Sequence, residues 1–177
     1  MPEERPFPTR RLSWSELVQL ILVEKDFGQL RRCRQDEQVY QEYMTNHVRA
    51  QYNSVMDFIL ITKLNVPTIE TDHSNDGKKR AAPLAQVIKD GEVRQALVRN
   101  DFPYYFATEV EHWILWKLGG GGISTQEIDA AKEDLREKLG DDVVDTLHWV
   151  NPPALKSIPE IDHVHILIRH GVDKEDE

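Results

Sequence analysis

The segment IDHVHILIRH, residues 161–170, alternates between aliphatic and other side chains at the two-residue period of a β-strand. One face of this predicted strand is aliphatic, and the other face carries two imidazoles. The aliphatic face holds Val164, Ile166 and Ile168, and the opposite face holds His163, His165, Leu167 and Arg169. Such a polar stripe on an apolar strand indicates that this face meets water, a partner or a substrate.

Two further strands and one helix are predicted just before this segment. Residues 111–118 alternate in the same way, so that His112, Ile114 and Trp116 share one face. A helix is expected over 124–139, because Ser124 and Glu127 form a capping-box pattern and Gly140 is a natural stop. Residues 144–150 form the remaining predicted strand.

The first half of the chain has helical periodicity. Ser13 and Glu16 give another capping-box pattern, which predicts a helix to about Lys25. Residues 29–66 contain neither glycine nor proline and predict one long helix, or two that abut, ending before Pro67. A polar surface loop is expected over 68–82, followed by a short helix over 83–98.

This order of elements predicts an α+β fold. A helical layer should pack against a small, mainly antiparallel sheet, which one further helix covers. We expect a single domain over residues 1–172, with an N-terminal arm at 1–12 and a disordered acidic tail at 173–177. A chain of 177 residues is long enough for one ordinary core.

Charge and composition exclude several classes of protein. The net charge of −9 argues against an extended nucleic-acid interface, which needs clustered Lys and Arg. The single cysteine, Cys33, excludes an internal disulfide and fits a reducing compartment. We see neither a secretory signal pattern nor a membrane span, so the expected location is the cytoplasm, with the nucleus as an alternative, and no membrane partner. No oligomeric state is predicted.

The histidines allow a metal site as one interpretation. Two imidazoles two residues apart on a strand, His163 and His165, can point at one ion, and His112 from a neighbouring strand would supply a third ligand. A divalent transition metal held in this way would lower the pKa of its bound water toward about 7. Otherwise no cofactor is expected.

The same histidines allow phosphate chemistry, because a neutral imidazole can attack phosphorus or act as a general acid and base. From the strand at 112–117 onward, the order of elements resembles the histidine-triad nucleotide hydrolases and transferases. That resemblance implies His163 as the nucleophile, with His165, Asn151 and Ser157 holding phosphate oxygens. The chain departs from the pattern at Ile161, where the third histidine would stand, and at Pro159 and Glu160.

A purely structural role is the alternative for all three histidines. They would then donate hydrogen bonds to backbone carbonyls, or stack on Trp113, Trp116 or Trp149.

The loop NDFPYY, residues 100–105, is the other candidate for ligand binding. Asn100 and Asp101 can bond to the backbone and Pro103 fixes φ, so the loop could present Asp101 or Tyr104 rigidly, or merely turn the chain. Positive charge for a phosphate could come from Arg99 and Lys156. The predicted ligand-binding residues are Arg99, Asn100, Asp101, Tyr104, Trp116, Asn151, Lys156 and Ser157, beside the candidate catalytic residues His112, His163 and His165.

Four motifs in order resemble the fungal N-acetylglucosamine-induced protein family, a domain of unknown function. They are RNDFPY at 99–104, HWILWK at 112–117, the run of Asn151, Pro152, Leu155, Lys156 and Ser157, and HVHIL at 163–167, preceded by LSWSEL near the N-terminus. The resemblance implies a cytosolic or nuclear single-domain protein whose production responds to an amino sugar, and it brings no established reaction or ligand.

The leading functional hypothesis is a small-molecule site for a phosphorylated or nucleotide-linked amino sugar. A histidine-dependent hydrolase or transferase acting on phosphate esters is the most concrete reaction. The alternatives are a non-catalytic binding or interaction module that responds to an amino sugar, and the three-histidine metal site.

Overall fold

A four-stranded antiparallel sheet is the centre of the computed structural model, which describes residues 6–69, 76–88, 92–156 and 158–171. The strand order is β3-β4-β6-β5, so the two longest strands lie in the middle. These strands are β3 (Arg94–Arg99), β4 (Val110–Leu118), β5 (Val143–Trp149) and β6 (Asp162–His170). The α+β class and the strands predicted near 111–118, 144–150 and 161–169 are confirmed.

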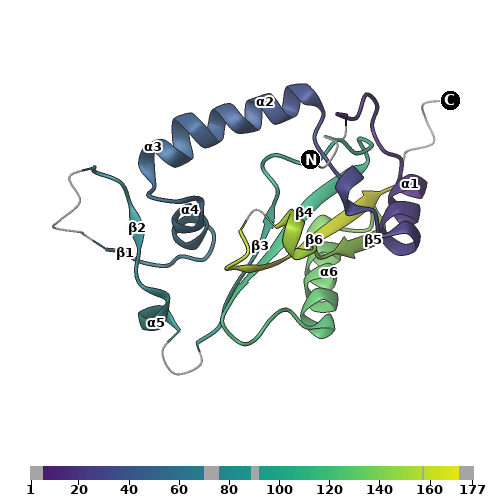
Figure 1. Ribbon diagram of the computed structural model, residues 1–177. Coiled ribbons are helices and arrows are strands. Elements are labelled where there is room, and N and C mark those ends of the chain that lie inside the picture. The colour runs from purple at the N-terminus through teal and green to yellow at the C-terminus, as the bar shows by residue number, and fades with distance from the viewer. Residues whose placement is uncertain (1–5, 70–75, 89–91, 157, 172–177) are drawn as a thin grey trace.

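One face of the sheet is covered by helix α6 (Thr125–Leu139), as Figure 1 shows. The helix begins with the predicted capping box, in which Ser124 and Glu127 each bond to the other's backbone N–H, and it ends at Gly140. Its Leu135 is fully buried against Val164, Ile166 and Ile168. The aliphatic face predicted for the C-terminal strand is therefore the face that packs against this helix.

The opposite face of the sheet carries the histidines and is covered by the N-terminal helices. Helix α1 (Trp14–Val18) and the π-helical turn η1 (Gln19–Glu24) pack near β5, where Leu17 contacts the cluster of Trp149 and Leu167. Helix α4 (Val55–Thr62) packs at the other end, where Leu60 joins Trp116 and Ile161. The predicted helical layer is confirmed, and it leaves the histidines between two apolar clusters.

Helix α2 (Arg34–Tyr43) lies across the top of this layer in Figure 1 and has no buried residue of its own. It continues directly into the π-helical turn η3 (Met44–Val48) and α3 (Arg49–Gln51). A short 3₁₀ turn, η2 (Phe27–Gln29), precedes it, and another, η5 (Pro153–Leu155), follows β5. None of the helices in the described ranges is long and apolar enough to cross a membrane.

The predicted helical stretch 29–66 is two helices, and its boundaries differ from the prediction. The second helix starts after Ser54, whose hydroxyl accepts a hydrogen bond from the N–H of Asp57. It ends several residues before Pro67, because Asn65 adopts a left-handed conformation with φ of 52°. The Val66 N–H then bonds back to the Leu60 carbonyl at 2.9 Å and closes the helix end.

The helix predicted over 83–98 is wrong for most of its length. Among the described residues of this span, only α5 (Leu84–Val87) is helical, and residues 94–99 form β3, which pairs with β4 from Arg94 opposite Leu118 to Arg99 opposite Trp113. The chain there contains few turn signals, so the available edge of β4 decides its conformation.

The predicted surface loop at 68–82 begins and ends in a two-stranded ladder. Its strands are β1 (Thr68–Ile69) and β2 (Arg80–Ala81). Within that loop, residues 70–75 lie outside the described residues, and so does the predicted acidic tail at 173–177. The N-terminal arm is held by the chain near Phe106: the Leu12 N–H donates to the Tyr105 carbonyl at 3.0 Å, and the Ala107 N–H donates to the Leu12 carbonyl at 2.9 Å.

Candidate functional site

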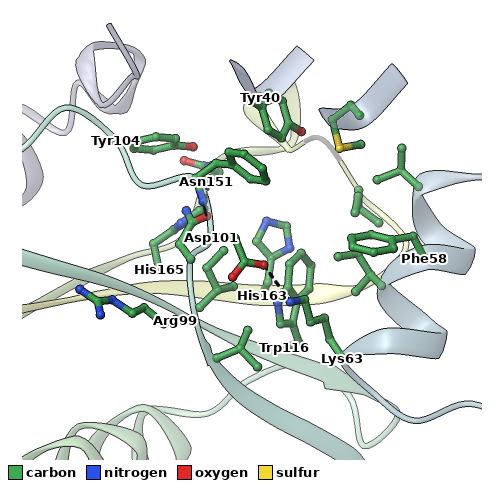
Figure 2. Close-up of a pocket in the computed structure, with 18 of the residues that line it drawn as sticks. Tyr40, Phe58, Lys63, Arg99, Asp101, Tyr104, Trp116, Asn151, His163 and His165 are labelled. Atoms are coloured by element: carbon green, nitrogen blue, oxygen red, sulfur yellow. Dashed lines mark hydrogen bonds and ion pairs between the residues drawn. The ribbon is translucent and has the colours of Figure 1, made fainter. Parts of the chain in front are cut away.

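A cavity of about 260 Å³ lies between the histidine face of the sheet and the N-terminal helices. We call it the His163 pocket. Figure 2 shows the His163 ring in the cavity, with Trp116 rising beside it from β4, Phe58 reaching in from α4 and Tyr40 above. The pocket is therefore mainly aromatic, with a few polar groups from the sheet and its loops.

Most of the predicted site residues converge on this pocket. Those that line it are Arg99, Asn100, Asp101, Tyr104, Trp116, Asn151, His163 and His165. His112 does not line the cavity and lies behind His165. Lys156 is also outside the lining, although its charge lies near enough to influence His163. Ser157 lies outside the described residues.

Part of the wall comes from helices that the sequence analysis did not connect with the site. Tyr40, Tyr43 and Met44 line the pocket from α2 and η3, and Phe58 and Lys63 line it from the α4 region. The spacing of Tyr40, Tyr43 and Met44 places them on one helix face. That spacing identifies the face but not what the face covers.

Two neutral polar groups, His163 and Tyr104, line the pocket. The Nδ1 of His163 lies 3.0 Å from the Ile161 carbonyl oxygen and so must donate to it, which leaves Nε2 as an acceptor. The His163 ring also stacks on Trp116, with ring centroids 4.7 Å apart. Burial lowers the pKa of His163, so the ring is neutral at pH 7. Burial raises the pKa of Tyr104, so its phenol keeps its proton.

His112 and His165 form a buried pair beside this centre. The His112 Nε2 lies 2.9 Å from the His165 Nδ1, and the two ring centroids are 5.1 Å apart. His165 also stacks on Trp149, with a centroid distance of 4.5 Å and an interplanar angle of 9°. Burial, helped by the Arg32 charge, lowers the pKa of His112 to about 3, and burial lowers that of His165 well below its usual value. Both rings are neutral near pH 7.

This geometry does not fit the three-histidine metal site. The facing nitrogens of His112 and His165 bond to each other, and His163 turns its Nδ1 toward a backbone carbonyl. Across the described part of the chain, no group of three or more His, Cys, Asp or Glu side chains is arranged to hold a metal ion. We therefore derive no chemical step through a metal.

The basic side chains around the pocket are already paired. Lys63 lies 3.1 Å from Asp101, and Arg99, which is largely exposed, makes a looser 3.7 Å contact with Glu111. Arg32 pairs with Glu37 at 3.2 Å and donates to the Phe102 carbonyl at 2.9 Å, while its guanidinium lies 4.0 Å from the Tyr40 ring centre. These pairs leave a pocket with polar groups and little net charge at its centre.

Comparison with known protein families identifies the family of this chain. A family model described as a protein of unknown function, DUF3605, matches residues 13–169, which include all the residues that line the His163 pocket and the main sheet as far as Arg169 of β6. The chain belongs to this DUF3605 family. No functionally curated protein matched the sequence.

One solved structure shares the fold of this DUF3605 chain. It is the crystal structure of HTC1, which superposes with a TM-score of 0.53 over 90% of this chain and 86% of the other, at 20% sequence identity. At that identity the likeness concerns the fold alone.

Proposed function

We propose that the His163 pocket binds an amino sugar or its phosphate ester. The observation that carries this proposal is the convergence of an aromatic wall with a small set of fixed polar groups in one cavity. Ligand pockets generally combine a mostly apolar lining with a few placed polar atoms that fix orientation. Trp116 and Phe58 would contact the carbon skeleton of the ring, and His163 Nε2 would accept a hydrogen bond from a hydroxyl.

The size of the cavity supports a monosaccharide rather than a larger molecule. Its volume of about 260 Å³ is slightly below the range of roughly 300–1,000 Å³ typical of pockets for drug-sized ligands. The nucleotide part of a nucleotide-linked sugar would therefore have to lie outside the pocket. The link to an amino sugar rests on the resemblance to the N-acetylglucosamine-induced proteins.

A phosphate on the ligand would meet the cations at the rim. Arg99 is the best placed, because its side chain is 66% exposed and its contact with Glu111 is loose. Lys63 would reach a phosphate only by exchanging its Asp101 partner, whose side chain is 63% exposed. Guanidinium groups bind phosphate through paired, charge-assisted hydrogen bonds.

A phosphate-ester hydrolase or transferase is the second candidate, favoured by the fixed tautomer of His163. With Nδ1–H held by the Ile161 carbonyl, the Nε2 lone pair is free to form a bond to phosphorus while the bond to the leaving oxygen breaks. Water or an acceptor hydroxyl would then take the phosphoryl group from the imidazole. The order of Asn151, His163 and His165 along the chain is the part of the histidine-triad resemblance that fits this step.

Calorimetric titration with glucosamine 6-phosphate, N-acetylglucosamine and N-acetylglucosamine 6-phosphate tests the binding proposal. We expect at least one of these probes to bind, and His163→Gln to weaken its binding about two- to tenfold, since a lost hydrogen bond costs about 0.5–1.5 kcal/mol and each 1.4 kcal/mol is a factor of ten. The matched control is His148→Gln, because His148 is half-buried on β5 and does not line the pocket. No binding of any probe, or equal affinity in both variants, would contradict the proposal.

Phosphorus NMR of the same mixtures separates the two candidates. Release of inorganic phosphate that disappears in His163→Gln would support the hydrolase. If a probe binds but its phosphate ester stays intact over a long incubation, with and without an added alcohol acceptor, the protein is a non-catalytic binding module.

A further inference from the structure

Four side chains form a line of hydrogen-bonding groups that runs from the 100–105 loop to the pocket. The Asn100 Nδ2 lies 3.2 Å from the His112 Nδ1, and the His112 Nε2 lies 2.9 Å from the His165 Nδ1. At the far end, the His165 Nε2 lies 3.2 Å from the Asn151 Nδ2. His112, His165 and Asn151 are all buried, so their polar atoms must find partners within the protein; outside this line, the Asn151 side chain also bonds to the Tyr104 phenol.

The orientation of both amides is fixed by groups that can only donate. The backbone N–H of Phe102 donates to the Asn100 Oδ1 at 3.0 Å, and the indole N–H of Trp149 donates to the Asn151 Oδ1 at 2.9 Å. Each amide must therefore turn its NH₂ group toward a histidine. An amide donor therefore faces the histidine pair at each end, at the His112 Nδ1 and at the His165 Nε2.

Two neutral histidines cannot satisfy all three contacts. To accept from both asparagines, His112 would carry its proton on Nε2 and His165 would carry its proton on Nδ1. These two protons would then face each other across the 2.9 Å contact. Adding a proton to either ring adds another donor, and removing one would leave a buried anion. One of the three contacts must therefore join two donors.

The contact between His165 and Asn151, at the pocket end of the line, is the one in which two donors face each other. The contact between the two histidines is the shortest at 2.9 Å, whereas both amide contacts are 3.2 Å. His165 and Asn151 both line the pocket, but His112 does not, so only at this end can an outside group reach both partners. His112 then accepts from Asn100 and donates from Nε2 to the His165 Nδ1. His165 keeps its proton on Nε2, next to the Asn151 NH₂.

We propose that the His165 Nε2–H and the Asn151 NH₂ together bind a neutral carbonyl oxygen of the ligand. This inference rests on the proposed function and specifies the ligand of that same pocket. A carbonyl oxygen has two lone pairs and can accept from both donors, which removes the donor–donor contact. A neutral acceptor fits better than an anion, because both histidines are neutral and Lys63 and Arg32 are already paired with carboxylates.

The tautomers can be read without any ligand, from long-range proton–nitrogen NMR correlations of the histidine rings. We expect both His112 and His165 to carry the proton on Nε2. His163 is an internal reference for the other tautomer, because its Nδ1–H donates to Ile161. A proton on Nδ1 of His165 in the wild-type protein would overturn the inference.

Asn100→Asp and Asn151→Asp are matched variants with opposite expected effects. An acceptor at position 151 should keep the proton on Nε2 of both rings. An acceptor at position 100 should reverse the line, so that both rings carry the proton on Nδ1 and His165 accepts from Asn151. If both variants had the same tautomers, the side chains at positions 100 and 151 would not determine which ring nitrogens of His112 and His165 carry the protons.

N-acetylglucosamine and glucosamine are the ligand probes, because they differ by one acetyl group; the titrations are done at mildly alkaline pH, where the glucosamine amine is uncharged, so that the carbonyl and not the charge distinguishes the two sugars. We expect the N-acetyl sugar to bind at least about tenfold more tightly, since leaving buried donors unsatisfied costs about 1–3 kcal/mol and 1.4 kcal/mol is a factor of ten. Asn100→Asp should remove this preference by turning His165 Nε2 into an acceptor. Binding of both sugars with equal affinity would overturn the inference while the proposed function stands, whereas absence of binding for these sugars and also for their 6-phosphates would overturn the proposed function itself.

Discussion

Replacing Ile166 with alanine is expected to lower the free energy of unfolding by about 2–5 kcal/mol. Ile166 is fully buried on β6 and belongs to the cluster under helix α6, where Leu135 is equally buried. Truncation removes apolar contacts and leaves a cavity that a central strand, paired on both sides, cannot close by moving. Urea denaturation followed by tryptophan fluorescence measures the loss.

Two milder substitutions serve as controls for the loss of stability expected in Ile166→Ala. Ile166→Val should cost only about 0.5–1.5 kcal/mol, because it removes a single methylene. Val144→Ala should change stability by less than about 0.5 kcal/mol, because Val144 is 54% exposed. If Ile166→Ala were as mild as Val144→Ala, the aliphatic face of β6 would not be packed as described.

Acidification from pH 7 to pH 5 is expected to destabilise the protein by about 2 kcal/mol through His112 alone. Burial lowers the pKa of His112 to about 3 in the folded protein, whereas an unfolded histidine titrates near 6.5. Between these values the unfolded chain binds the proton and the folded protein does not, so stability falls as the pH falls below about 6.5. The 1.5 pH units down to pH 5 correspond to about 2 kcal/mol at 1.36 kcal/mol per unit. His165 and His163, whose pKa values are also lowered, add to this loss.

Urea denaturation at pH 7, 6 and 5, in the wild-type protein and in His112→Gln, checks this expectation. The variant should show a smaller slope of stability against pH, whatever its stability at pH 7. The carboxyl groups of Glu16 and Glu127, whose pKa values are lowered to about 2 by hydrogen bonds, lose their contribution only below about pH 4.5 and so do not interfere. Equal stability of the wild-type protein at pH 5 and pH 7 would contradict the prediction.

The C-terminal half of the fold could be predicted because local signals and tertiary structure agree there. The two-residue alternation in β6 separates the face under α6 from the face under the N-terminal helices, both of which are buried, and the capping box before α6 forms as expected. By contrast, β3 is an edge strand, and its residues adopt a ladder only because β4 offers one. Its own sequence between Arg94 and Arg99 carries no signal that separates a strand from a helix.

The position of the break between α3 and α4 could not be predicted, for a different reason. It contains no glycine or proline, and it depends on Ser54 as a cap and on Asp57, which is nearly buried. The Asp57 carboxylate accepts a hydrogen bond from the backbone N–H of Ala81 at 2.8 Å, so that the helix start is tied to β2. This long-range contact is invisible in a local pattern.

Sequence reasoning found the sheet side of the pocket but not its helical side. His163, His165 and Asn151 stood out because polar side chains are unusual on strands that are otherwise apolar. Tyr40 and Tyr43 did not stand out, because aromatic residues at helical spacing are normally part of a core. Only the tertiary arrangement shows that they cover a cavity.

The His163 pocket has walls from two separate stretches of the chain, the helices before Pro67 and the sheet region from Val98 onward. Any molecule held between them would oppose the separation of the two layers. Helix α2 buries none of its own residues and should open most readily, so its backbone amides should exchange with deuterium quickly in the free protein. A slower exchange of residues 34–43 would thus report occupancy of the pocket directly, even for a compound whose binding produces no measurable heat.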